Sequence, residues 1–139
     1  MWTRSHSIVT KEVTKEQMWK LFADVNNWYS WDKGIEFAKI EGDFKTGNSI
    51  ILKPQGGPEI KVEILDVIEN KRFMDVSIFP WTRLYDDHLF EETEDGLKIT
   101  ITIRLEGFLW FVWRKLVAQN IVDNLPREML EQIKFASKL

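Results

Sequence analysis

The chain contains no cysteine in its 139 residues. This absence excludes disulfide bonds, thiolate catalysis and zinc sites built on cysteine. Only two histidines are present. A metal site would need several further histidine or carboxylate ligands that converge on one point, so we predict no metal and no cofactor.

An excess of positive charge is also missing, since the net charge is -3. Proteins that bind nucleic acid usually show a basic patch, so we expect no nucleic-acid partner. No window reaches the roughly 18 apolar residues that a membrane-spanning helix needs, and we expect no integral membrane segment. The start, residues 1–6, has no apolar signal core. The expectation is one cytoplasmic domain over residues 1–139.

Aromatic side chains, by contrast, are abundant, with seven tryptophans and nine phenylalanines. Such side chains supply large apolar areas, and a tryptophan N–H also needs a hydrogen-bond partner. Two interpretations stay open. The aromatic residues either fill a well-packed core or line a cavity for an apolar or ring-shaped ligand.

The longest regular stretch is the C-terminal one, Gly107 to Leu139, which predicts a long helix. Its apolar residues recur at helical spacing and form one stripe. Pro126 predicts a kink in this helix. Trp110 and Trp113 lie off the stripe, either as core beneath other helices or as an exposed patch for a partner or a membrane surface. The stripe consists of Phe111, Ala118, Val122, Leu125, Met129, Ile133 and Ala136.

The preceding chain predicts a strand, two short helices and a series of hairpin-connected strands, which is an α+β arrangement. Thr14 and Gln17 have the spacing of a capping box, which predicts a helix to about Asp24. A second helix is expected near 28–34, and a β-bulge or a twist near Leu65. The loop 54–58 is either a plain hairpin loop or a mobile lid. The predicted strands are 3–12, 35–41, 49–53, 59–69, 72–79, 83–93 and 97–106.

Three sequence features carry a resemblance to a known superfamily. They are Met18–Asp24 followed by Trp28 and Trp31; Gly42–Gly47 before a strand ending at Pro54; and Phe90, then Gly96, then a last strand ending at Gly107 before the long helix. In this order they resemble the START-like or Bet v 1-like (SRPBCC) superfamily, and most of all the bacterial polyketide cyclase/dehydrase-like proteins. The resemblance implies the helix-grip fold, in which a curved antiparallel sheet wraps around a long C-terminal helix.

The resemblance also implies a cavity between sheet and helix. It therefore favours binding of a small hydrophobic ligand, which is lipid-, polyketide- or aromatic-like, by a monomer or homodimer. An alternative is a cyclase or dehydratase that uses His88 as general acid or base, and a weaker one is a protein-interaction module. The superfamily shares no catalytic residue that would transfer to this chain. The candidates for the cavity lining are Trp28, Trp31, His88, Phe90, Ile101, Ile103, Phe111, Val122, Leu125 and Met129.

Several of these residues have a second interpretation. His88 is either an acid-base group or a polar wall held by a neighbour. Asp86, on the same predicted face, either orients His88 or, as we favour, lies in water. Asp75 is a buried carboxylate if Phe73 faces inward; we favour the opposite phase, with Met74, Val76 and Ile78 inward and Asp75 solvated. Trp28 and Trp31 lie either at the cavity mouth or in the core.

Overall fold

The computed structural model describes all 139 residues and contains one seven-stranded antiparallel sheet. The order across the sheet is β1-β7-β6-β5-β4-β3-β2, so that consecutive hairpins β2 to β7 form a meander and β1 closes against β7. The strands are β1 (Trp2–Thr10), β2 (Ile35–Ile40), β3 (Ser49–Pro54), β4 (Ile60–Ile68), β5 (Arg72–Phe79), β6 (Thr82–Thr93) and β7 (Gly96–Glu106).

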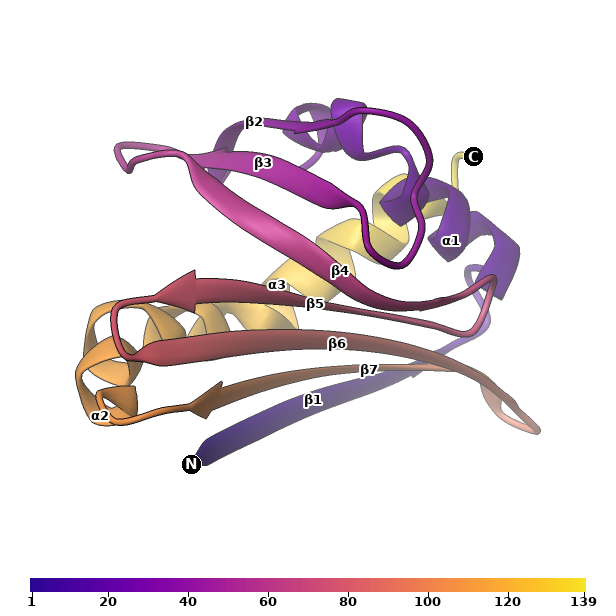
Figure 1. The fold of residues 1–139 in the computed structure, drawn as a ribbon. Coiled ribbons are helices and arrows are strands. Elements are labelled where there is room, and N and C mark those ends of the chain that lie inside the picture. Colours follow the sequence, from indigo (N-terminus) through magenta and orange to yellow (C-terminus); the bar gives the residue numbers. More distant parts are fainter.

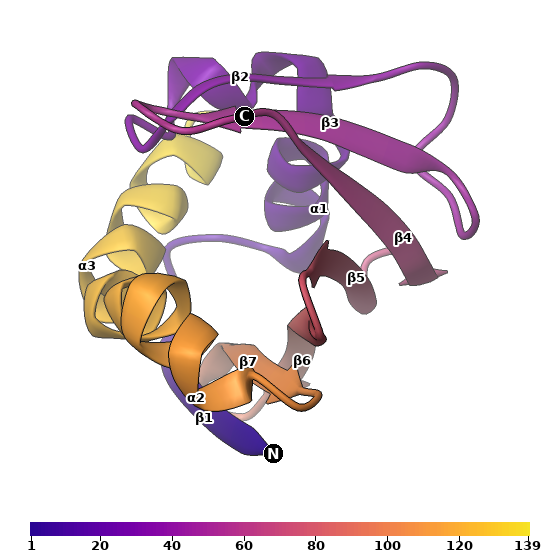
Figure 2. The same ribbon diagram turned by 60° about the vertical axis from the view of Figure 1, so that its left-hand side comes forward.

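The sheet bends around the C-terminal helix, which lies across its open side (Figures 1 and 2). Between β1 and β2 the chain forms α1 (Lys15–Ala23) and the 3-10 helix η1 (Val25–Ser30). After β7 come α2 (Trp110–Trp113), the π-helical segment η2 (Arg114–Ala118) and α3 (Gln119–Ala136). The predicted helix-grip fold is therefore confirmed.

The strands and the first helix follow local sequence signals closely. The Thr14 hydroxyl accepts from the Gln17 backbone N–H at 3.1 Å, and the Gln17 side chain accepts from the Thr14 N–H at 2.9 Å, which confirms the capping box. The second helix starts earlier than predicted, at Val25. The Trp28 indole N–H donates to the Phe22 carbonyl at 2.9 Å, and this bond fastens η1 to the end of α1.

The predicted bulge in β4 is also confirmed. The register with β5 passes from the pair Ile64 and Asp75 directly to the pair Asp66 and Met74, which leaves Leu65 unpaired. An extra residue of this kind bends a strand and increases its twist. The bulge therefore contributes to the curvature that lets the sheet wrap around α3.

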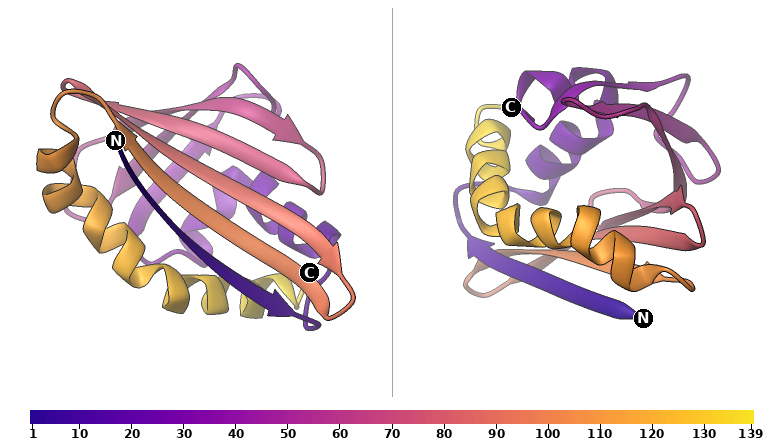
Figure 3. Two further views of the ribbon diagram at one scale, coloured as in Figure 1. Left: turned by 90° about the horizontal axis from the view of Figure 1, so that it is seen from below. Right: turned by 90° about the vertical axis from the view of Figure 1, so that its left-hand side faces the viewer.

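The C-terminal helix is less regular than its sequence predicted. It starts at Trp110, and η2 interrupts the α-helical hydrogen bonding. A π-helical turn holds more residues than an α-helical one, so it shifts the phase of the stripe. Phe111 is consequently 55% exposed, and its predicted place on the buried stripe is wrong. The helix continues through Pro126 and curves visibly along the sheet (Figure 3).

The core lies between the inner face of the sheet and the helices. Along β7 every second residue is buried, as the alternation predicted. From α3 the buried side chains are Leu125, Met129, Ile133 and Ala136. The β7 side chains are Leu97, Ile99, Ile101, Ile103 and Leu105, and they belong to the same cluster as the α3 side chains.

Candidate functional site

Two cross-strand pairs bring polar groups to the inner face of the sheet. Phe73 on β5 is the register partner of His88 on β6, and Asp75 is the partner of Asp86. Phe73 and His88 are 1% and 6% exposed. Side chains two residues apart on a strand share a face, so both aspartates also face inward.

The favoured prediction for β5 was therefore wrong. Asp75 is 7% exposed, whereas Ile78, which was expected inside, is 60% exposed. Of the residues expected inside, Val76 is buried, at 4% exposed. Asp75 faces inward because the ring of Phe73 packs between Trp19 and Phe22, with ring centroids 6.1 and 5.2 Å away. Burying this ring fixes the phase of the strand and carries Asp75 inward two residues later.

His88 lies in an aromatic environment. Its ring stacks on Phe73 at 4.1 Å between centroids and lies 4.9 Å from Phe22. Burial lowers the pKa of His88 to about 3, although the charge of Asp87 acts in the opposite direction. The imidazole is therefore neutral at ordinary pH. Its Nδ1 has no hydrogen-bond partner.

Asp86 lies beside this imidazole, with its Oδ1 3.5 Å from His88 Nδ1. The Oδ1 atom is enclosed and makes no hydrogen bond, although the side chain as a whole is 30% exposed. Burial and the negative charge of Asp87 raise the pKa of Asp86 to about 7. The preference for Asp86 in open water was wrong, and the alternative, a carboxyl next to His88, describes its position.

Asp75 is more deeply enclosed. Its side chain is 7% exposed, and none of the side-chain hydrogen bonds or ion pairs around it, which Arg72 makes with Asp66 and Asp87, involves its carboxyl. Burial, followed by the charges of Asp86 and Asp87, raises the pKa of Asp75 well above its ordinary value. Two adjacent carboxyls without a cation favour a state in which at least one of them holds a proton.

A second acidic group lies where the segment after η1 meets α3. A small pocket there has a volume of about 10 Å³, which holds about one water molecule. Burial raises the pKa of Asp32 and of Glu128. The charges of Asp32, Glu131 and Asp86 raise the pKa of Glu128 further, while Arg127 lowers it. The pocket is thus electrostatically connected to Asp86. Its lining residues are Trp31, Asp32, Glu128, Glu131 and Gln132.

Asp32 and Glu128 are not among the site residues predicted from the sequence. Glu128 directly precedes Met129 on the buried stripe, which places it at the edge of the inner face. Asp32 follows Trp31, which is 8% exposed, and its Oδ1 accepts from the Gly34 N–H at 2.9 Å. Each carboxylate is adjacent in sequence to a buried apolar residue, and this was the signal from which a position near the interior could have been predicted.

Most of the predicted lining residues are buried, whereas Val122 and Phe111 are not. Trp28 and Trp31 pack against each other with ring centroids 6.3 Å apart, while Val122 is half-buried and Phe111 faces solvent. Phe90 lies 6.4 Å from Trp19 and belongs to the α1 side of the core. The buried members of the predicted lining are Trp28, Trp31, His88, Phe90, Ile101, Ile103, Leu125 and Met129.

Trp110 and Trp113 are half-buried rather than an exposed patch. Trp113 stacks on Phe79 at 4.7 Å and donates its indole N–H to the Pro80 carbonyl at 3.0 Å. These contacts attach the start of the C-terminal helix to the β5–β6 turn. The large exposed aromatic residues at this end are Trp81, Phe108 and Phe111, at 75%, 79% and 55%.

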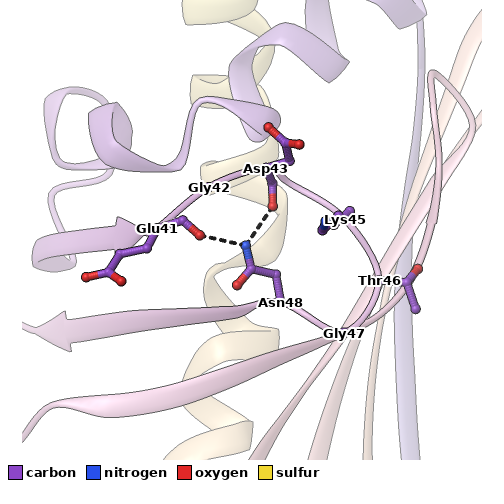
Figure 4. A pocket seen from close by; sticks show the side chains of 7 residues that line it. All are labelled: Glu41, Gly42, Asp43, Lys45, Thr46, Gly47 and Asn48. Carbon is purple, nitrogen blue, oxygen red and sulfur yellow. Dashed lines mark hydrogen bonds between the residues drawn. The ribbon is translucent and has the colours of Figure 1, made fainter.

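A larger surface hollow, of about 480 Å³, lies over the β2–β3 loop, residues 41–48 (Figure 4). The Asn48 side-chain amide donates to the carbonyls of Glu41 and Asp43 at 2.9 and 2.8 Å. Asn48 therefore stabilises the loop itself. All the lining residues come from this one loop and none is hydrophobic, so the inner face of the sheet is the stronger candidate site.

No group of three or more histidine, aspartate or glutamate side chains converges to hold a metal ion. No helix is long and apolar enough to span a membrane. The inner-face site consists of the buried Asp75 carboxyl, the partly exposed Asp86 carboxyl and a neutral imidazole beside the rings of Phe22 and Phe73.

Comparison with known proteins assigns the fold. No family model and no curated protein sequence matches the chain. Solved structures do match along nearly its whole length at low sequence identity, and they include Ara h 8.0201 (TM-score 0.74, 12% identity, 99% of each chain). The protein has the Bet v 1-like helix-grip fold, which confirms the resemblance at the level of fold.

Two further structures show the range of proteins with this fold. One is the hypothetical protein jhp0584 of Helicobacter pylori (TM-score 0.79, 11% identity, 97% of this chain and 88% of that one). The other is the di-domain ARO/CYC StfQ of the steffimycin biosynthetic pathway (TM-score 0.78, 9% identity). The match to StfQ covers 98% of this chain and 50% of StfQ.

Proposed function

We propose that the protein binds a small, largely apolar molecule between the inner face of its sheet and α3. In this proposal Asp75, Asp86 and His88 contact the polar end of that molecule. The observation that carries the proposal is His88, which is 6% exposed and has an unpartnered Nδ1 that lies 3.5 Å from an equally unpartnered Asp86 oxygen. A buried polar atom without a partner costs about 1 to 3 kcal/mol, and a ligand that supplies hydrogen bonds removes this cost.

The route to this site follows the seam between η1 and α3. The pocket at Trp31 and Glu128 is small in this conformation, so the proposal requires side chains along the seam to move apart. Glu128, which lines this pocket, is 40% exposed, so the route would open to solvent there, and the negative charge of Asp86 raises the pKa of Glu128. Ara h 8.0201 and StfQ, an ARO/CYC protein of a biosynthetic pathway, have a similar fold.

Two matched substitutions on α3 test the proposal. Leu125 faces inward at 4% exposed, whereas Leu130 faces solvent at 60%. The neutral fluorescent probe N-phenyl-1-naphthylamine should bind saturably to the wild type, with an affinity about tenfold or more weaker for Leu125→Trp and unchanged for Leu130→Trp. Circular dichroism confirms that both variants fold. Absence of saturable binding, or equal effects of the two variants, would contradict the proposal.

A second candidate function is acid-base catalysis of the cyclase or dehydratase kind. The close contact between Asp86 and His88 favours it, but the roles differ from those expected. His88, with a pKa of about 3, is a weak base, whereas Asp86, with a pKa of about 7, is matched to proton transfer near neutral pH. His88 then positions the carboxyl.

Turnover of a poly-β-ketone substrate distinguishes the roles. Asp86→Asn should lower kcat by about a hundredfold or more, and His88→Ala by a smaller factor together with a shift of the pH profile. If both variants turn over the substrate like the wild type, neither residue takes part in catalysis.

A further inference from the structure

The inner face of the sheet carries acidic side chains and no buried lysine or arginine. Asp75 and Asp86 face the interior of the sheet, and Asp32 and Glu128 lie at the seam that leads to it. The buried polar and charged residues of the chain are Asp75, Thr82 and His88, so no lysine or arginine accompanies these carboxyls inside.

The cations closest in sequence are engaged elsewhere. Arg72 donates to Asp87 at 2.9 and 3.0 Å and to Asp66 at 3.3 Å, and Asp87 neighbours Asp86 on the opposite face of β6. Arg127, next to Glu128, is 62% exposed and pairs with Glu131 along α3. Among the remaining carboxyls, Glu128 lies 3.9 Å from the Arg127 guanidinium, whereas Asp32, Asp75 and Asp86 form no ion pair with a lysine or arginine.

The surroundings of these carboxyls also suit a cation. His88 is neutral, is more than nine-tenths buried and directs an unpartnered nitrogen toward Asp86. Aromatic rings enclose the same region: Phe22 lies 4.9 Å from the His88 ring and 5.6 Å from Trp31. The faces of aromatic rings attract organic cations, and the attraction is stronger where water is excluded.

We propose that the ligand of this site is an organic amine, whose ammonium group binds between Asp75 and Asp86 while its apolar part packs against the aromatic side chains. This inference rests on the function proposed above and adds the charge of the ligand. A carboxylate or phosphate ligand would add a negative charge to a site that already has an excess. A wholly apolar ligand would leave three polar side chains without partners. The ammonium group supplies three donors for the carboxyl oxygens and the imidazole nitrogen.

Binding of an ammonium group next to Asp86 would change the protonation of the carboxyls there. The titratable groups that face Asp86 are Asp75 from β5, His88 from its own strand and Glu128 from α3, while β7 contributes the apolar Ile103 as register partner. The charge of Asp32 raises the pKa of Glu128, and the charge of Asp87, on the opposite face of β6, raises the pKa of Asp86. The carboxyl pair holds a proton in the free protein near neutral pH, so binding of a cation releases protons and strengthens as the pH rises.

Isothermal titration calorimetry with three probes of one shape tests the inference. The probes are 3-phenylpropylamine, 3-phenylpropan-1-ol and 3-phenylpropanoate, which carry a positive, no and a negative charge. Near neutral pH, the amine should bind about tenfold or more tightly than the alcohol, and the propanoate more weakly than the alcohol. Titration of the amine in two buffers of different ionisation enthalpy should reveal proton release, and titration of the alcohol should not.

Isosteric variants locate the effect. Asp75→Asn and Asp86→Asn should each weaken amine binding about tenfold or more while changing alcohol binding about twofold or less. Asp95→Asn, which removes the same charge from the exposed β6–β7 turn, should bind all three probes like the wild type. Circular dichroism and thermal unfolding confirm that the variants are folded.

The outcomes separate this inference from the proposed function. If the alcohol or the propanoate binds as tightly as the amine, or if the asparagine variants retain amine affinity, the charge assignment is wrong while ligand binding stands. If none of the three probes and no neutral fluorescent probe binds, both proposals are contradicted.

Discussion

Asp75 on β5 and Asp86 on β6 are directly opposed in the antiparallel register, and both face the inner side of the sheet. Opposed residues have Cβ atoms about 5 Å apart, a distance at which two carboxylates repel each other strongly in a site of low dielectric. The pair therefore opposes folding whenever both members are ionised.

The first prediction concerns Asp75→Asn. Because Asp75 has a folded-state pKa well above its unfolded value of 3.8, the folded protein binds more protons than the unfolded chain, and stability is lost as the pH rises above about 4. The asparagine variant cannot ionise. Relative to wild type, its free energy of unfolding should be similar at about pH 4 and greater at about pH 8.

Urea denaturation at a series of pH values measures this difference. Asp95→Asn, in an exposed turn, serves as the charge control and should follow the wild-type profile. A wild-type advantage over Asp75→Asn that grows with pH would show that the carboxylate is stabilised by a partner, contrary to the geometry described above.

The second prediction concerns His88→Phe. The folded-state pKa of about 3 lies below the ordinary value of 6.5, so His88 contributes stability above about pH 6.5 that is lost as the pH falls toward 3. Phenylalanine keeps the stacking on Phe73 and removes the unpartnered nitrogen. The variant should be at least as stable as wild type at about pH 7 and should lose less stability in acid.

His88→Ala is the comparison for packing at this position. It leaves a cavity beside Phe73 and should cost about 2 to 4 kcal/mol at neutral pH, as measured by urea denaturation. If His88→Phe destabilises the protein as much as His88→Ala does, the imidazole makes a polar interaction that the structure lacks.

The third prediction concerns Gly107, where the chain leaves β7 for the C-terminal helix. Its φ is +122°, and a Cβ atom added there would lie 2.4 Å from the Trp81 carbonyl oxygen. Gly107→Ala should therefore lower stability by about 3 kcal/mol or more. Gly47 is the control, because its φ is +90° and nothing lies within 4 Å of an added Cβ. Its substitution by alanine measures the cost of the left-handed backbone conformation without a steric clash.

Thermal unfolding of the two alanine variants tests this reasoning. Gly47→Ala should cost only about 1 to 2 kcal/mol, because a left-handed conformation is its single penalty. Equal losses for both variants would mean that the contact between Gly107 and Trp81 does not constrain the start of the helix.

Much of the fold could be predicted from local patterns. The strict alternation from Leu97 to Glu106 fixed both the strand and its buried face, and the spacing of Thr14 and Gln17 fixed the start of α1. These features depend on residues within a few positions of each other, which a sequence displays directly. The irregular segment η2 was missed because nothing in the apolar spacing distinguishes a π-helical turn from an α-helical one.

The candidate site depended on information that a single strand lacks. Both faces of β5 carry large apolar side chains, so its alternation permits either phase. The packing of Phe73 against α1, and its pairing with His88 on the next strand, decide the question. Likewise, the influence of Asp86 on Glu128 arises only when α3 crosses the sheet.

The most direct test of the account is a pH titration of the aspartate side-chain carboxyls followed by carbon-13 NMR, with Asp75→Asn and Asp86→Asn used for assignment. We expect Asp86 to titrate at about 7 and Asp75 also well above 3.8. In the presence of saturating 3-phenylpropylamine, both titrations should move to lower pH, because the ammonium group favours the ionised carboxyls. Titration of both residues near 3.8 without the amine would contradict the claim that they form an unpartnered pair inside the sheet.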